Sequence, residues 1–297
     1  MYHKPVLLTE SIEGLSLKPD GIYVDATFGG GGHSREILKK LVGGKLIAFD
    51  QDDEAIANLP DDDRICLVTR NFRYLTHFLR YLDAIPVDGI LCDLGVSSHQ
   101  IDSPERGFST RFDGELDMRM NNNKTLTARE VVNKYPEEKL KDILQLYGEI
   151  DNARKSAAAL VNARSNQEIV TTTDLKAALQ RCMPRGKENQ YLAQVFQALR
   201  IEVNQELDSL REFLEQTEKV LGHGGRLVMI SYHSLEDRLV KNFMRNGNLE
   251  GTVEKDFYGN LRTPFHQVTR KPMLAGEEET RENPRARSAK MRIAEKL

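Results

Sequence analysis

The fold class is inferred from one stretch, Ile22-Tyr-Val-Asp-Ala-Thr-Phe-Gly-Gly-Gly-Gly-His-Ser34. An apolar run rich in β-branched and aromatic residues ends at Asp25, four glycines follow at 29–32, and the residues from Ser34 onward have helical spacing. This order predicts a strand, a glycine turn and a helix that Ser34 caps. Glycine adopts backbone angles closed to other residues and lets a ligand approach the main chain. The turn is therefore a candidate cofactor site.

The glycines do not fit the dinucleotide pattern Gly-x-Gly-x-x-Gly, because its last position, counted from Gly29, falls on Ser34. Residues 25–31, Asp-x-Thr-x-Gly-x-Gly, are instead similar to the acidic-x-Gly-x-Gly-x-Gly loop of S-adenosylmethionine-dependent methyltransferases. Thr27 replaces the first glycine of that loop. A flexible turn without a ligand is the alternative for such a glycine run.

A second acidic residue follows the next apolar run. Lys45-Leu-Ile-Ala-Phe-Asp50 ends in a carboxylate 19 residues after Gly31. In α/β nucleotide-binding units, an acid about 20 residues on accepts hydrogen bonds from the ribose hydroxyls. The alternative is that Asp50 caps the following helix, a role that Asp52 and Asp53 fit better.

Composition favours a soluble globular protein with two domains, since 39% of the 297 residues are hydrophobic and 29% are charged. No apolar stretch is long enough to span a bilayer and no signal peptide is evident, so we expect a cytoplasmic protein. The three cysteines, at 66, 92 and 182, form no Cys-x-x-Cys pair. They are expected to be buried thiols, and no metal site is predicted.

Charge is distributed unevenly along the chain. Residues 121–202 hold 13 Lys and Arg against 10 Asp and Glu, and residues 262–297 hold 9 against 5. Because the net charge is −3, the remainder carries −10. This asymmetry permits a basic substrate face on an acidic body, and solvated surface is the alternative.

The strand pattern predicts a doubly wound parallel sheet. Residues 64–69 and 88–93 continue the alternation of strands and helices. Ligands of such sheets bind beyond the carboxyl ends of the strands, where four candidate residues fall: Asp25, Asp50, Phe72 and Asp93.

The next strand, residues 226–231, begins 133 residues after Asp93, and the gap has helical patterns. We therefore predict a Rossmann-like α/β domain, residues 1–108 and 201–297, with an all-α domain inserted at 109–200. One or two of the helices should pack on the sheet. Ser234 is expected to cap a helix, residues 246–284 to be irregular and residues 285–293 to form an outer strand.

The chain resembles the bacterial 16S rRNA cytosine-N4 methyltransferases along nearly its whole length. Eight segments in the same order carry the resemblance: His3-x-Pro-Val-Leu-Leu-x-Glu10, Asp25-Ala-Thr-Phe-Gly-Gly-Gly-Gly-His-Ser34, Asp93-Leu-Gly-Val-Ser-Ser98, Glu105-Arg-Gly-Phe-Ser109, Asp117-Met-Arg-Met120, Phe196-Gln-Ala-Leu-Arg-Ile-Glu-Val-Asn204, Ser231-Tyr-His-Ser-Leu-Glu-Asp-Arg238 and Asn283-Pro-Arg-Ala-Arg-Ser288.

The resemblance implies S-adenosylmethionine-dependent methylation of N4 of one cytidine in the decoding region of 16S rRNA, within the small ribosomal subunit. It also implies seven cofactor contacts: Gly31, Gly32, His33, Asp50, Phe72, Asp93 and Gln100. The sequence alone favours a capping-region imidazole for His33, a core aromatic for Phe72 and a surface amide for Gln100. The candidates for accepting hydrogen bonds from the target amine are the Asp93 carboxylate or the backbone carbonyls of residues 93–95, with Ser97 or Ser98 assisting.

Two departures leave roles open. Residues 187–195 replace a His-Pro-Ala-Thr-Arg run of many relatives, and Asp93-Leu-Gly-Val-Ser-Ser98 differs from the Pro-Pro-aromatic motif of many amino-methyltransferases. Phe108 and Tyr232 either hold the target base or belong to the core, and a helix-start role is expected for His233. Five arginines are either phosphate contacts or salt-bridge partners: Arg106, Arg111, Arg119, Arg285 and Arg287. A small-molecule methyltransferase and an RNA-binding module without catalysis are the alternative functions.

Overall fold

The computed structural model describes residues 5–259 and 262–297. The chain divides into two compact units: unit 1 comprises the residues up to Gly95 and from Leu207, and unit 2 comprises Val96–Glu206. Unit 2 thus starts earlier and ends later than the predicted insertion, 109–200. His3, which begins the first of the resembling segments, lies outside the described residues.

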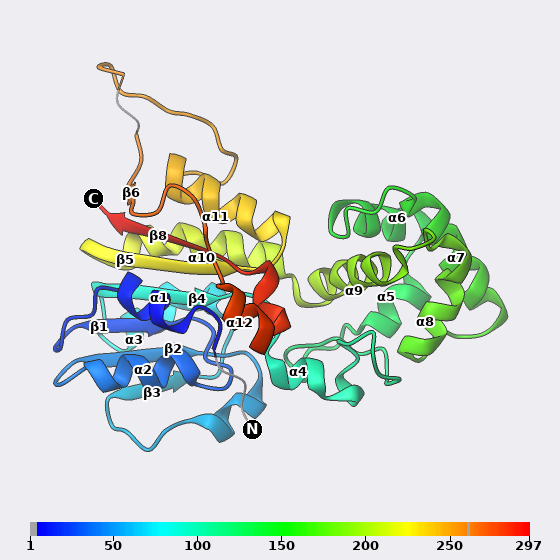
Figure 1. The fold of residues 1–297 in the computed structure, drawn as a ribbon, viewed down its shortest axis with the longest axis horizontal. Helices are drawn as coiled ribbons and strands as arrows, with labels where there is room; N and C mark the ends of the chain where they lie inside the picture. Colours follow the sequence, from blue (N-terminus) through cyan, green and yellow to red (C-terminus); the bar gives the residue numbers. More distant parts are fainter. Residues whose placement is uncertain (1–4, 260–261) are drawn as a thin grey trace. The chain divides into compact units, whose positions relative to one another are not determined.

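Unit 1 is built on a mostly parallel sheet (Figure 1). The described residues form eight strands, in the order β3-β2-β1-β4-β5-β8-β6 with β7 beside β8. Strands β1 to β5 pair in parallel, and β8 runs antiparallel to β5. This confirms the predicted Rossmann-like α/β class. The strands are β1 (Ile22–Asp25), β2 (Lys45–Phe49), β3 (Ile65–Val68), β4 (Val87–Asp93), β5 (Leu221–Ser231), β6 (Phe265–Gln267), β7 (Met273–Leu274) and β8 (Lys290–Lys296).

Helices cover both faces of this sheet. The apolar sides of α3, α10 and α11 share one buried cluster with the strands, to which Leu79, Phe213 and Phe243 contribute. On the other face Ile37 of α2 packs in a second cluster with residues next to α1. The packing of α10 on the sheet confirms the predicted crossover helix. The elements are α1 (Leu8–Gly14), α2 (Gly32–Lys40), α3 (Leu75–Tyr81), α10 (Glu206–Val220), α11 (Ser234–Asn246) and α12 (Glu277–Glu282), with 3-10 turns η1 (Asp53–Asn58), η2 (Phe72–Tyr74) and η5 (Pro284–Ser288).

Unit 2 is helical, as predicted, and has its own core. Leu144, Leu160 and Val195 are fully buried in it and come from three different helices. Its elements are α4 (Ser98–Asp102), α5 (Ala128–Lys134), α6 (Glu137–Leu146), α7 (Ala153–Asn166), α8 (Thr172–Leu179) and α9 (Glu188–Asn204), with η3 (Pro104–Arg106) and η4 (Gln180–Cys182).

Several local predictions were wrong. Strand β5 begins at Leu221 rather than residue 226, because its glycine-rich start pairs with β4 across a register shift at Val87. The outer strand begins at Lys290, because Asn283 instead caps the 3-10 turn η5. Cys66 is exposed, since it lies on the edge strand β3, whereas Cys92 and Cys182 are buried.

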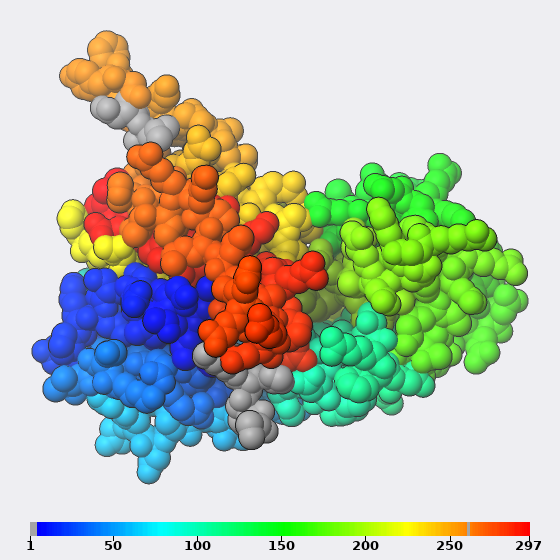
Figure 2. Space-filling view, in the orientation of Figure 1, coloured from blue at the N-terminus to red at the C-terminus, as the bar shows by residue number. Residues whose placement is uncertain are grey.

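The segment 246–284, predicted to be irregular, contains the short elements β6, β7 and α12. The loop after α11 projects from unit 1 (Figure 2). It carries the exposed side chains of Phe257 and Tyr258. Among the described residues, no helix is long and apolar enough to cross a membrane.

Candidate functional site

Three carboxylates lie at the carboxyl ends of neighbouring strands in unit 1. Asp25 ends β1, Asp50 follows β2 and Asp93 ends β4, and β1 lies between β2 and β4 in the sheet. Burial raises the pKa of each of these carboxyl groups to about 6. The structure thus brings three of the predicted side chains to one edge of the sheet.

Asp25 is buried beneath the glycine turn. Its Oδ2 accepts a hydrogen bond from the Ser34 hydroxyl at 2.6 Å, and its Oδ1 accepts one from the Thr27 amide at 3.1 Å. The predicted Ser34 cap was wrong, because the cap of α2 is Gly31, three residues earlier, and Ser34 is buried in the first turn of the helix. A buried serine beside a carboxylate satisfies that carboxylate rather than the helix end.

The glycine turn cannot accommodate side chains at two of the predicted positions. Gly31 has φ 71°, and a Cβ there would lie 2.8 Å from the Phe28 ring. A Cβ on Gly32 would lie 2.1 Å from Cγ of Pro5. Both glycines are therefore required by the local packing.

Two side chains that the sequence did not single out hold the carbonyls of the turn. Arg35 donates to Gly30 O at 2.6 Å and to Asn58 O at 2.7 Å, and the Asn58 amide donates to Gly29 O at 3.0 Å. Arg35 lies one residue beyond the resembling segment, and Asn58 lies in η1, so neither carried a motif signal. Together they fix the conformation of the turn.

Asp50 also holds the turn. Its Oδ2 accepts a hydrogen bond from the Gly29 amide at 2.7 Å, and its Oδ1 accepts one from the Asp52 amide at 2.9 Å. The alternative cap role belongs to Asp52, whose carboxylate accepts from the Glu54 amide at 3.2 Å. Asp50 therefore links the glycine turn to the end of β2.

Asp93 is held by two residues of unit 1. The Tyr232 hydroxyl donates to Oδ1 of Asp93 at 2.7 Å, and the Asp93 amide donates to Oγ1 of Thr27 at 2.7 Å. Thr27 thereby joins the glycine turn to β4, which gives a physical reason for the threonine that replaces the usual glycine. Oδ2 of Asp93 has no hydrogen-bond partner among the described residues.

His33 is buried in the first turn of α2. Its Nε2 lies 3.1 Å from the carbonyl oxygen of Val6, which can only accept, so Nε2 carries the hydrogen. Burial lowers the pKa of His33, although Asp93 and Glu279 oppose this shift. Glu279 in α12 accepts a hydrogen bond from the Leu7 amide at 2.7 Å. His33 therefore packs against the N-terminal segment.

The carboxyl edge of unit 1 is strongly acidic. The pKa of Tyr232 is raised, first by burial and then by the charges of Asp93, Glu236 and Glu279. Carboxylates gathered in a partly buried region make a negative potential, which favours a cationic ligand.

The remaining predicted residues are placed differently. Phe72 is half-buried, packs against the core and makes an edge-to-face contact with Phe213 at 5.0 Å between ring centroids. Gln100 is buried in unit 2, where its Oε1 accepts a hydrogen bond from the Ser97 amide in a capping box of α4. The expectation of a surface amide for Gln100 was wrong, because this capping box encloses it.

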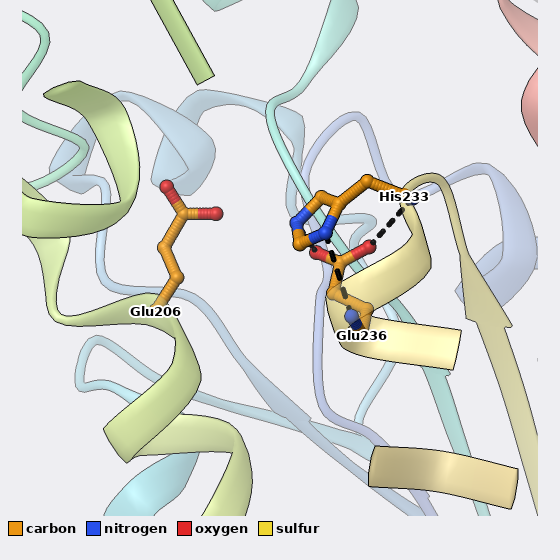
Figure 3. A group of neighbouring side chains, drawn as sticks. All are labelled: Glu206, His233 and Glu236. Carbon is orange, nitrogen blue, oxygen red and sulfur yellow. Dashed lines mark hydrogen bonds and ion pairs between the residues drawn. The ribbon is translucent and has the colours of Figure 1, made fainter. Parts of the chain in front are cut away.

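His233 begins α11, as expected. Its Nδ1 accepts a hydrogen bond from the Glu236 amide at 3.4 Å, and its Nε2 lies 3.1 Å from Oε1 of the buried Glu236 carboxylate (Figure 3). Glu236 in turn accepts from the Tyr232 amide at 2.9 Å. The predicted Ser234 cap was wrong, because this His233–Glu236 capping box starts the helix one residue earlier.

Replacement of Thr27 tests the link between the turn and β4. Thr27→Val should lower the free energy of unfolding by about 1–2 kcal/mol, because the Asp93 amide loses its acceptor. Urea unfolding at pH 7.5 measures this loss. Thr27→Ser keeps the hydroxyl and should lose less than half as much. A small loss in Thr27→Val together with a larger loss in Thr27→Ser would show that the methyl group, not the hydrogen bond, matters.

Asp25→Asn should stabilise the fold above pH 6 by about 2 kcal/mol relative to the native chain. Burial raises the pKa of Asp25 from 3.8 to about 6, so the folded state favours its protonated form. Its contribution to stability is therefore full below pH 4 and falls as the pH rises to 6. The asparagine amide of the variant has the same shape as the carboxyl group and stays uncharged, so the variant does not lose stability over this pH range. Urea unfolding from pH 4 to pH 8 should show the difference growing through this window, and a constant difference would contradict this account.

The model of the MraW methylase family matches residues 1–297. A protein of Phocaeicola vulgatus named ribosomal RNA small subunit methyltransferase H is 56% identical over 297 residues, which are 100% of this chain and 98% of the relative. A protein of the same name from Cytophaga hutchinsonii is 57% identical over 298 residues, 100% of each chain.

Among solved structures, one described as an rRNA methylase from Streptococcus thermophilus aligns with a TM-score of 0.44 and 13% identity, covering 100% of this chain and 99% of that chain. The family match confirms the predicted family, the methyl-transfer chemistry and the cofactor, S-adenosylmethionine. The chain belongs to the MraW methylase family.

Proposed function

We propose that this protein methylates the exocyclic N4 of one cytidine in the decoding region of 16S rRNA, within the small ribosomal subunit. The relatives named as small-subunit rRNA methyltransferases, at 56–57% identity over the whole chain, are the observation that carries the rRNA substrate. The eight resembling segments favour the cytosine-N4 position. A ribosomal substrate also places the protein in the cytoplasm.

In this proposal the methionine part of the cofactor lies against the main chain of the turn at Gly31 and Gly32, because glycine lets a ligand approach the backbone. In this proposal His33 lies beside the same part, and Asp50 accepts hydrogen bonds from the ribose hydroxyls. Phe72 stacks on the adenine and Asp93 completes the contacts from unit 1, while the contact from Gln100 is proposed from the resemblance alone. The acidic edge suits the positive charge of the sulfonium.

The bound cofactor supplies an electrophilic methyl group. Cytosine N4 is a poor nucleophile, because its lone pair is delocalised into the ring. Asp93 can accept a hydrogen bond from the N4 amine through Oδ2, while Tyr232 holds Oδ1. An ionised acceptor favours the pyramidal amine and orients its lone pair towards the methyl group. After transfer the methylated amine carries a positive charge and loses one proton to the ionised Asp93 or to solvent, so positioning contributes more than base catalysis.

Unit 2 is the substrate-recognition domain in this proposal. The target base must be unstacked or lie in single-stranded RNA, because its N4 is otherwise paired and stacked. Phe108 packs on the core of unit 2, and the Tyr232 hydroxyl donates a hydrogen bond to Asp93. Of the two proposed base-holding aromatics, Tyr232 therefore lies next to the chemistry.

Incubation with methyl-labelled S-adenosylmethionine and small subunits from an unmethylated strain tests the proposal. We expect label on one cytidine, at N4, in nucleosides separated by chromatography and mapped by mass spectrometry. Asp93→Asn protein and fully methylated subunits are the controls, and both should give little label. Label on another base or on a small molecule alone would overturn the proposed substrate.

A further inference from the structure

Five basic side chains of unit 2 gather where α7 begins and η4 ends. Arg154 and Lys155 lie in the first turn of α7, Arg181 lies in η4, and Arg185 and Lys187 lie in the loop before α9. All five are exposed. Residues 152–187 hold seven Lys and Arg against two Asp and Glu, which is denser than in the whole insertion. These five residues are called the α7–η4 patch.

Hydrogen bonds hold the two segments of the α7–η4 patch side by side. Nζ of Lys155 donates to Arg181 O at 2.9 Å, and the Asn152 amide donates to Cys182 O at 2.8 Å. The contact of α7 with α8, which leads into η4, can be followed in Figure 1. The cations therefore form one surface although they are distant in sequence.

The loop before α9 turns its charges outward. Gly186 has φ 77° with open space around it, and the Lys187 amide donates to Pro184 O at 3.1 Å. The neighbouring acid, Glu188, accepts a hydrogen bond from the Gly186 amide at 2.9 Å. Among the described residues this carboxylate forms no ion pair with Arg185 or Lys187, so it serves the turn.

None of the five side chains of the α7–η4 patch has an ion-pair partner among the described residues, whereas several other basic side chains of unit 2 do. Elsewhere in unit 2, Lys134 pairs with Glu130 at 2.7 Å and Arg129 pairs with Glu168 at 2.9 Å. Lys139 pairs with Glu202, and Lys141 pairs with Glu138. The charge of an unpaired exposed cation is available to attract an anionic partner, whereas the charge of a paired cation is largely neutralised by its carboxylate.

We propose that the α7–η4 patch binds the phosphate backbone of ribosomal RNA, which deepens the proposed function and rests on it. Three of its five side chains are arginines, whose planar forks match phosphate oxygens. The nearby exposed amides of Gln180, Asn189 and Gln190 can donate to phosphates and ribose hydroxyls. Residues 180–190, all described, expose no large apolar side chain. This segment therefore has no side chain that could insert into a membrane surface.

Two of the arginines that the sequence suggested as phosphate contacts serve the fold instead. Arg106 is buried and donates to the carbonyl of Arg119 at 3.0 Å. Arg119 pairs with Asp117 at 2.7 Å and donates to Lys124 O at 2.6 Å. The guanidinium groups of both arginines are engaged within the protein, so the α7–η4 patch is the better candidate for phosphate contacts.

A quadruple variant of the full-length protein tests the proposal: Arg154→Gln, Arg181→Gln, Arg185→Gln and Lys187→Gln. The matched control removes the same charge from paired cations of unit 2: Arg129→Gln, Lys134→Gln, Lys139→Gln and Lys141→Gln. Binding to protein-free 16S rRNA and to small subunits is measured from 50 to 300 mM KCl. Calorimetry with S-adenosylmethionine and methylation assays are run on the same preparations.

If half of the four cations contact phosphates, the slope of log K against log [KCl] should fall by about 1.5 and binding at 150 mM KCl should weaken about 20-fold. The control should change binding less than 3-fold, and cofactor affinity should stay unchanged in both variants. Equal losses in the two quadruple variants would overturn the proposal while leaving the proposed function intact. If the quadruple variant of the patch bound small subunits more weakly but bound free RNA normally, the patch would contact a ribosomal protein. That result would also overturn the proposal. A native chain that binds and methylates neither substrate would overturn the proposed function itself.

Discussion

Asp93→Asn should lower kcat about 100- to 1,000-fold at saturating cofactor and RNA, while the protein stays folded. The asparagine keeps the shape of the side chain but replaces one acceptor oxygen with a donor and removes the charge that favours the pyramidal amine. Single-turnover methylation of small subunits measures the effect. The control is Asp88→Asn at the opposite end of the same strand, where the carboxylate holds the Ile22 amide at 3.0 Å. A loss of less than 3-fold for Asp93→Asn would show that another group activates the amine.

The pH profile distinguishes an active carboxylate from a merely structural one. Burial raises the pKa of Asp93 to about 6, so the ionised form accumulates, and activity should rise, as the pH increases through 6. His33 and the Tyr232 hydroxyl both lower this pKa. Tyr232→Phe removes one of these stabilising contacts and should move the acid limb of kcat upward by about one pH unit. An unshifted limb would mean that Asp93 is not the group that titrates.

The sequence predicted the sheet better than the contacts around it. Strand ends at Asp25 and Asp93 could be located because short apolar runs stop at a charged residue, and parallel strands place such ends at one edge. The hydrogen bond from Tyr232 to Asp93 joins residues 139 positions apart and has no local signal. Likewise, nothing in the sequence shows that Asn58 reaches the glycine turn.

The wrong caps have a common physical cause. Serine is a residue type that often caps helices, but neither Ser34 nor Ser234 does so here. In each case a neighbouring group either takes the serine hydroxyl or caps the helix in its place. The buried Asp25 takes the Ser34 hydroxyl, and the His233–Glu236 pair starts α11 before Ser234 can. Burial also explains why Arg106 is not a phosphate contact. This arginine lies in the interior of unit 2, where its guanidinium donates a hydrogen bond to a backbone carbonyl oxygen.

Asp50→Ala should weaken S-adenosylmethionine binding about 100-fold, because the proposed charge-assisted hydrogen bonds from the ribose hydroxyls to Asp50 would be lost. The variant also leaves the Gly29 and Asp52 amides without their acceptor, which loosens the turn proposed to bind the methionine part. Calorimetry at pH 7.5 measures the affinity. Asp52→Asn, which keeps an oxygen for the Glu54 amide, is the matched control and should change the affinity less than 3-fold.

The protonation state of Asp50 supplies an independent test of the same contact. Burial raises the pKa of Asp50 to about 6, against the opposing effect of its two amide hydrogen bonds. Hydroxyl donors favour the ionised carboxylate, so cofactor binding should release protons near pH 6 and weaken as the pH falls below it. Calorimetry in buffers with different ionisation enthalpies detects this release. Asp50→Asn should abolish the part of the release that belongs to this group. If Asp50 only held the turn, the cofactor would not alter its pKa, and proton release would be the same in the native chain and the variant.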